Sequence, residues 1–161
     1  MSDPDVAVLP QKIHGMPTSD YAQVLRERLP DYDVALAHTP EAERDLVTRA
    51  SVATGQWVDP DLLGESSLDL FACVFAGTDH LPLEELAAHD VAVTSAAGVH
   101  APNVAEHVLG AILSFTRGFH TAFRLRERRE WRSFQARELQ GSTVTVVGLG
   151  SIGQNVVERL E

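Results

Sequence analysis

The chain has 161 residues, an apolar fraction of 44%, one cysteine and a formal net charge of −10. This length allows one ordinary domain, or one domain and part of a second, and the apolar content is enough for a real core. The acidic balance argues against a nucleic-acid surface, no apolar stretch is long enough to span a bilayer, and the acidic start does not resemble a signal peptide, so we expect a soluble cytoplasmic protein.

Arginine supplies all but one of the 13 basic residues, the exception being Lys12. An acidic, lysine-poor surface resembles that of halophilic proteins, in which salt screens the self-repulsion. A GC-rich genome that favours arginine explains the same composition, and both interpretations stay open. The single cysteine, Cys73, lies in an apolar run and is expected to be a buried thiol.

Short apolar runs alternate with helix-like stretches over the first hundred residues. Strands are predicted at Val6–Pro10, Tyr32–His38, Leu68–Gly77 and Val91–Gly98, and helices at Ser19–Pro30, Thr39–Ala50 and Leu81–Asp90. Ser19 is a possible cap, and Thr39 is a strong one because Pro40 and acidic residues follow it. This rhythm predicts an α/β domain with a parallel sheet.

A long helix is predicted from Asn103 to Arg128. Asn103 is a favourable cap, and Glu106 stands three residues later, where a capping-box acid belongs. The first half of the helix is mostly apolar, which suits an element between two bodies or at a subunit interface. A polar connector, Arg132–Thr143, follows, and a β-branched strand is predicted at Thr143–Val147.

The sequence "VTVVGLGSIG" places Gly148, Gly150 and Gly153 at G-x-G-x-x-G spacing between that strand and a helix-like segment. The first glycine permits a tight turn, the second lets a pyrophosphate approach the backbone, and the third lets helix and strand pack closely. Free N–H groups at the helix start attract phosphate. This context favours a dinucleotide site over a turn that serves only packing.

Two further motifs make the pattern specific. The stretch "FAGTDHLPLEELAAHDVAVTSAAGVHAPNVAEHVLGAIL" has a strand ending in a G-x-D turn, then a second strand, a loop and a V-A-E-H helix, and the glycine fingerprint follows. In this order the motifs resemble the D-isomer-specific 2-hydroxyacid dehydrogenase family. The resemblance implies a flavodoxin-like substrate-binding domain at residues 1–101. At 102–161 it implies the beginning of a Rossmann domain that binds NAD or NADP, truncated after the glycine loop.

The resemblance also implies roles for individual residues. Ala76, Gly77 and Thr78 align with the loop whose backbone amides hold the substrate carboxylate of a 2-oxo or 2-hydroxy acid. His100 stands where many relatives carry a substrate-facing asparagine, and a local loop role is equally open for it. Val104 aligns with a nicotinamide-pocket position or belongs to the core. The expected cofactor-binding residues of the glycine loop are Gly148, Leu149, Gly150, Ser151, Ile152 and Gly153.

The family's catalytic arginine, acid and histidine follow the glycine loop, so none is assigned in this chain, which we expect to be inactive alone. The histidines at 80, 89, 100 and 107 fit no standard zinc spacing, and no metal is expected. The resemblance implies a homodimer through the helix starting at Asn103. Two other hypotheses are a noncatalytic dimerising or regulatory module with a dehydrogenase-like fold and a short NAD-sensing domain.

Overall fold

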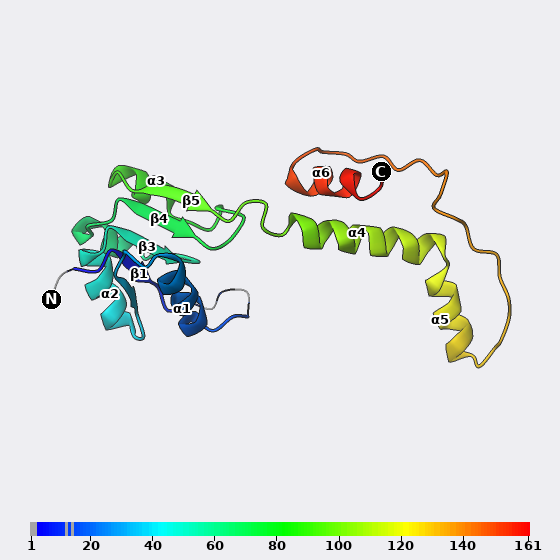
Figure 1. Ribbon diagram of the computed structural model, residues 1–161, viewed down its shortest axis with the longest axis horizontal. Helices are drawn as coiled ribbons and strands as arrows, with labels where there is room; N and C mark the ends of the chain where they lie inside the picture. Colours follow the sequence, from blue (N-terminus) through cyan, green and yellow to red (C-terminus); the bar gives the residue numbers. More distant parts are fainter. Residues whose placement is uncertain (1–2, 12, 14) are drawn as a thin grey trace. The chain divides into compact units, whose positions relative to one another are not determined.

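Five short strands form one parallel sheet in the order β2-β1-β3-β4-β5 (Figure 1). The computed structural model describes residues 3–11, 13 and 15–161. The strands are β1 (Val6–Val8), β2 (Val34–Leu36), β3 (Val52–Gly55), β4 (Leu70–Cys73) and β5 (Ala92–Ser95). This strand order is that of flavodoxin-like folds, so the predicted class of this part of the chain is confirmed. Because all pairs are parallel, every strand ends at the same edge of the sheet.

Helices cover both faces of the sheet. Side chains along a strand point alternately to the two faces, so apolar strand residues need helices to pack against on each side. They are α1 (Thr18–Arg28), α2 (Pro40–Arg49), the 3-10 helix η1 (Pro60–Glu65) and α3 (Leu83–Ala88). Ala7 and Leu9 belong to a core cluster shared with α2, η1 and α3. Val6 and Val8 face the other way and pack in a smaller cluster with Ala22 of α1.

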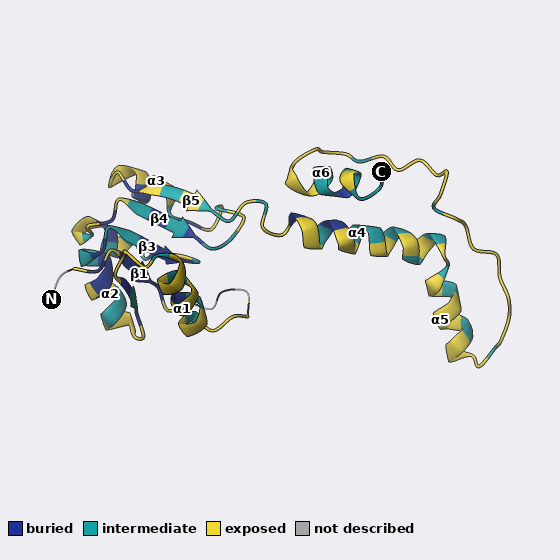
Figure 2. Ribbon diagram, viewed as in Figure 1, coloured by how far each residue is buried: buried dark blue, intermediate teal, exposed yellow. Residues whose placement is uncertain are grey.

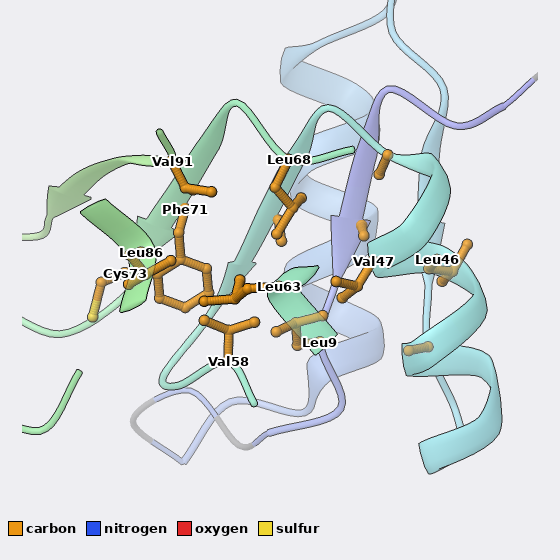
Figure 3. Packing of buried hydrophobic residues seen from close by; sticks show 14 of the residues in the cluster. Leu9, Leu46, Val47, Val58, Leu63, Leu68, Phe71, Cys73, Leu86 and Val91 are labelled. Carbon is orange, nitrogen blue, oxygen red and sulfur yellow. The ribbon is translucent and has the colours of Figure 1, made fainter. Parts of the chain in front are cut away.

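The larger cluster is the main hydrophobic core (Figure 3). Phe71 of β4, Leu63 of η1 and Leu86 of α3 are almost completely buried there. Cys73 is a free, buried thiol, as its apolar surroundings predict. In Figure 2 the buried residues concentrate in the sheet and in the helix sides that face it.

Helix α2 forms where the sequence predicts it. The Thr39 hydroxyl accepts a hydrogen bond from the Ala42 amide at 3.2 Å, and Pro40 occupies the first position. Helix α1, in contrast, begins at Thr18 after Pro17, and no side chain caps it, so the cap role predicted for Ser19 is wrong. Strand β3 was not predicted from the sequence. Ala53, Thr54 and Gly55 have small side chains and do not form the apolar run by which the other strands were recognised.

Residues Gly98–Glu161 form a second unit, separate from Met1–Ala97. It contains α4 (Ala101–Thr116), α5 (Phe119–Glu127) and α6 (Ser151–Glu158). Helix α6 packs on α4, with Ala105 and Val156 buried. A long, mostly exposed segment joins α5 to α6 (Figure 2).

Three predictions for this unit are wrong. The helix begins at Ala101 rather than Asn103, because Pro102 suits the first helical turn, and its cap is His100. It does not run unbroken to Arg128, since Gly118 adopts a left-handed conformation with φ of 67° and separates α4 from α5. Thr143–Val147 forms no strand, because the unit, which the structure describes throughout, contains no strand with which it can pair.

Candidate functional site

The glycine loop is a turn that leads directly into α6. Gly148 has φ of 99°, a left-handed conformation that glycine adopts without the steric cost of a Cβ. Gly150 is the N-cap residue of α6, which starts at Ser151, and its backbone is extended. The first glycine is therefore required by the turn itself.

Gly153 is required by packing. A Cβ atom on this residue would overlap the carbonyl oxygen of Gly148 and lie 3.1 Å from its carbonyl carbon. Both neighbours are backbone atoms and cannot be moved by a change of rotamer. Gly150 differs from Gly148 and Gly153, since its φ is −70° and a Cβ there would meet nothing within 4 Å. Neither turn geometry nor packing against the described residues therefore requires a glycine at position 150.

The start of α6 presents unpaired donors. Its first helical hydrogen bond runs from the Gln154 amide to the Gly150 carbonyl, at 3.0 Å. Within the described residues, the amides of Ser151, Ile152 and Gly153 donate to no protein group. Ser151 and Ile152 are exposed. Together with the helix dipole, three such N–H groups favour an anion.

A hollow of about 700 Å³ adjoins this turn. The glycine loop and Ser151 line it on one side, and Val108 and Ile112 of α4 contribute apolar surface. The combination of apolar walls with a few converging polar groups is typical of small-molecule sites.

The predicted anion loop Ala76–Thr78 lies in the first unit, where β4 ends. Ala76 and Gly77 are exposed and Thr78 is half-buried. In the part of the chain that the structure describes, none of the three amides donates a hydrogen bond. A Cβ on Gly77 would meet nothing within 4 Å, so an approaching ligand has room.

Hydrogen bonds hold this loop on both sides. The Val74 amide donates to the Gly55 carbonyl at 3.0 Å, and the Ala96 amide donates to the Phe75 carbonyl at 2.9 Å. After the loop, the Leu81 amide donates to the Thr78 carbonyl at 2.9 Å. The three unused amides are therefore presented by a supported turn.

His100 and Val104 both lie at the start of α4. His100 is exposed at the N-cap position, where its side chain makes no capping bond, and the Val104 amide donates to its carbonyl at 2.9 Å. Val104 is half-buried and is not among the residues that line the hollow. Gly98, two residues before His100, approaches Ser151, since a Cβ built on it would lie 3.8 Å from Ser151 Cβ. The starts of α4 and α6 are thus neighbours, while the roles of His100 and Val104 stay predictions.

Sequence reasoning missed two polar residues at the carboxyl ends of β1 and β3, on the same edge of the sheet as Ala76–Thr78. Gln11 follows β1, and Gln56 follows β3, at the point where strand order reverses and α/β folds commonly bind ligands. The available signal was the α/β rhythm, which calls for a strand between α2 and the next helix. Once β3 is placed, Gln56 follows as a residue at the carboxyl edge of the sheet.

Two negative findings apply to residues 3–11, 13 and 15–161. No group of three His, Cys, Asp or Glu side chains there is arranged to hold a metal ion. No helix among them has the length and apolar character of a membrane span.

Comparison with known proteins connects both loops to one family. Residues 109–161 match the family model described as "D-isomer specific 2-hydroxyacid dehydrogenase, NAD binding domain". A D-3-phosphoglycerate dehydrogenase of Mycobacterium bovis is 34% identical over 134 residues, which are 81% of this chain and 24% of the relative. A glyoxylate/hydroxypyruvate reductase of Arabidopsis thaliana is 33% identical over 119 residues, 70% of this chain and 37% of the relative.

Solved structures agree on the fold. A D-lactate dehydrogenase from Treponema pallidum matches with a TM-score of 0.78 and 20% identity, over 96% of this chain and 49% of that one. A D-isomer-specific 2-hydroxyacid dehydrogenase family protein from Aeromonas salmonicida matches with a TM-score of 0.73 and 23% identity, over 98% of this chain and 50% of that one. The chain belongs to the D-isomer-specific 2-hydroxyacid dehydrogenase family. It spans about a quarter of the length of the phosphoglycerate dehydrogenase and about half of these solved chains.

Proposed function

We propose that this chain supplies the two anion-anchoring loops of an NAD- or NADP-dependent D-2-hydroxyacid dehydrogenase. The reaction is reversible hydride transfer between NAD(P)H and a 2-oxo acid, giving a D-2-hydroxy acid. Residues 1–101 serve as the substrate-binding domain and 102–161 as the start of the nucleotide-binding domain. The geometry of the glycine loop carries the proposal: the fold requires Gly148 and Gly153, whereas it leaves open space at Gly150, where a pyrophosphate could approach the backbone.

The residues present fit a dinucleotide. Gly150 leaves open space at the backbone, and the amides of Ser151, Ile152 and Gly153 supply donors for a pyrophosphate. Leu149 is 64% exposed and offers apolar contact beside them. When bound, the nicotinamide supplies the hydride chemistry. The chain's own contribution is to hold the anionic part of the cofactor at a rigid helix start, which orients the rest.

The substrate is proposed to bind at Ala76, Gly77 and Thr78. Consecutive backbone amides in an exposed turn can donate together to one carboxylate, and a fixed turn loses little freedom when it binds. His100 is proposed as a second contact, because imidazole can donate to a carboxylate or carbonyl oxygen. Val104 is proposed to contact the nicotinamide.

Proton transfer and carbonyl polarisation are assigned to no residue of these 161. In the family pattern the catalytic arginine, acid and histidine come after the glycine loop, so the other histidines, including His80, His89 and His107, are given no catalytic role. We therefore expect negligible hydride transfer and only weak dinucleotide binding by this chain alone. Tight binding of NADH in calorimetry would contradict this.

Titrations followed by NMR of amide nitrogens test the proposed sites directly. Addition of NADH is expected to shift the amides of Ser151–Gly153, and addition of pyruvate, a simple 2-oxo acid, those of Ala76–Thr78. The Gly150→Ala variant is expected to lose the NADH shifts while its fold is unchanged. Gly110→Ala is the matched control, because Gly110 also has open space around it but lies within α4. NADH shifts that persist in Gly150→Ala would overturn the pyrophosphate assignment.

We further propose a cytoplasmic homodimer formed through α4 and α5. Phe115, Phe119 and Phe123 are 75%, 48% and 59% exposed and, with His120, line a small hollow. Exposed aromatic side chains in a group mark interaction surfaces. The same observation favours the second candidate function, a noncatalytic dimerising or regulatory module. Sedimentation shows whether a dimer forms, and a dimer in which neither NADH nor pyruvate shifts the predicted amides would favour the module.

A further inference from the structure

One hydrogen-bond network next to the predicted anion loop contains residues to which no role has been assigned above. It joins Gln11 after β1 to His80, the residue two positions beyond the loop, through the backbone of Gln56 after β3. We propose that Gln11 and His80 are positioning residues that fix the backbone of Ala76–Thr78, whose amides donate no hydrogen bond within the described residues. The role of that loop as a carboxylate site rests on the function proposed above.

Gln11 fixes the turn that follows β3. Its Oε1 accepts hydrogen bonds from the Gln56 amide at 2.8 Å and the Trp57 amide at 3.2 Å. Its Nε2 donates to the Trp57 carbonyl at 2.9 Å. One carboxamide thus satisfies three backbone groups of the turn that follows β3. The peptide carbonyl of Gln56 is held in a defined direction as a result.

Gly55 makes this arrangement possible. A Cβ on Gly55 would lie 2.6 Å from Gln11 Oε1 and 3.0 Å from Leu9 Cβ. The Gln11 side chain would have to leave its position to relieve that contact. Glycine normally weakens a strand. Gly55 is needed here because it leaves room for the Gln11 side chain at the end of β3.

His80 connects this turn to the anion loop. Its Nε2 lies 2.7 Å from the Gln56 carbonyl oxygen, which requires the ring to donate from that nitrogen. The ring also packs edge-on against Phe75, with ring centroids 5.8 Å apart. Phe75 and His80 bracket the three amides, so both ends of the loop are fixed to the same support.

The consequence is preorganisation. An exposed turn whose amides have no protein partner loses conformational freedom when it binds a ligand, unless it is already ordered. In the described residues, the His80 side chain bonds to Gln56 and packs on Phe75, and the amides of Ala76–Thr78 donate to no protein group, so we expect its effect on binding to be exerted through the loop. Its substitution should increase loop motion and weaken binding of a carboxylate without changing the core around Phe71.

A set of variants in the 161-residue chain tests this. His80→Phe keeps an aromatic ring against Phe75 and removes the hydrogen bond to Gln56. His80→Gln places a carboxamide nitrogen near the position of the imidazole Nε2 and is the conservative variant. His89→Phe is the matched control, because His89 is an exposed histidine of the same unit at the end of α3, away from this network.

Two measurements are made on each variant. Relaxation of the amide nitrogens of Ala76–Thr78 reports loop order without any ligand, and pyruvate titration reports binding at the same amides. We expect His80→Phe to lower the heteronuclear NOE of these three amides and to weaken pyruvate binding about tenfold, as loss of one hydrogen bond allows. His80→Gln should restore most of both, and His89→Phe should match the wild type.

The outcomes separate this proposal from the proposed function. If loop relaxation in His80→Phe equals that of the wild type, the positioning role is overturned whatever pyruvate does. If pyruvate shifts none of the three amides in the wild type, the carboxylate site is wrong, and the relaxation data still decide whether His80 orders the loop. Gly55→Ala, which displaces Gln11, should reproduce the His80→Phe relaxation change, and unchanged relaxation would remove Gln11 from the network.

Discussion

Substitution of Gly153 by alanine is the sharpest test of the glycine-loop geometry. The added Cβ would overlap the Gly148 carbonyl oxygen, far inside ordinary contact, which begins at 3.4 Å. The loop and α6 must therefore move apart to relieve the overlap. Overpacking of this kind costs about 1–3 kcal/mol.

The opposing force is the burial that holds α6 on α4. Val156 is the one residue of α6 that is buried, with 4% exposure, and full burial of a valine contributes about 1.5–3 kcal/mol. The cost of overpacking and the free energy gained by burying Val156 are similar in size. We therefore expect α6 to detach partly from α4 in the alanine variant, instead of staying in place with the steric clash. A detached helix of eight residues does not persist in water.

Chemical shifts of Ser151–Glu158 measure the helix directly. In Gly153→Ala they should move toward random-coil values, with the largest changes at the helix start. Gly150→Ala is the matched control, because its Cβ meets open space and should leave α6 intact. If α6 keeps its helical shifts in Gly153→Ala, the close packing of helix and loop is not what this glycine provides.

Four further predictions concern stability. Phe71→Ala removes a side chain with 0% exposure and should destabilise the first unit by about 3–5 kcal/mol in urea unfolding, and a loss below 1 kcal/mol would contradict the core assignment. Burial, with repulsion from Asp59, raises the pKa of Glu43 above 4.5. The contribution of Glu43 to folding stability is therefore most favourable below pH 4.5 and is lost as pH rises through the folded-state pKa. The Glu43→Gln variant should stabilise the fold at pH 7 and not at pH 4. Hydrogen bonds from its own backbone amide and from Thr39 lower the pKa of Glu41, so Glu41→Gln should have the opposite sign at pH 7, and equal effects of the two variants would refute the argument. If the charge of −10 reflects adaptation to salt, added KCl should raise the midpoint of thermal unfolding, and a midpoint independent of KCl would remove that interpretation.

Local sequence was informative where a signal depends on neighbouring residues alone. The Thr39 cap is confirmed because it needs only the next turn of helix. The parallel sheet follows from the alternation of apolar runs with helical stretches, and the family follows from ordered motifs. Helix boundaries were less secure, since Asn103 and Ser19 are good caps by residue type, whereas Pro102 and Thr18 lie within the helices that form.

The strand predicted at Thr143–Val147 shows the limit of propensity. Its residues are β-branched, yet Val147 is 96% exposed and the segment pairs with nothing in the unit. Strand β3 is the opposite case, since its small residues carry little propensity, but it forms because β1 and β4 both pair with it. A strand is stabilised by its neighbours, so residue type alone decides neither case.

Glycine spacing and strand–helix rhythm are local and ordered along the chain, so the amino-acid sequence was enough to predict the class of fold, the family and the two loops that we propose bind anions. Which glycine serves the turn and which serves packing became clear only from the folded structure, which also brings Gln11, Gln56 and His80 together. Those assignments depend on distances between atoms far apart in sequence, and these are set by strand order and side-chain packing.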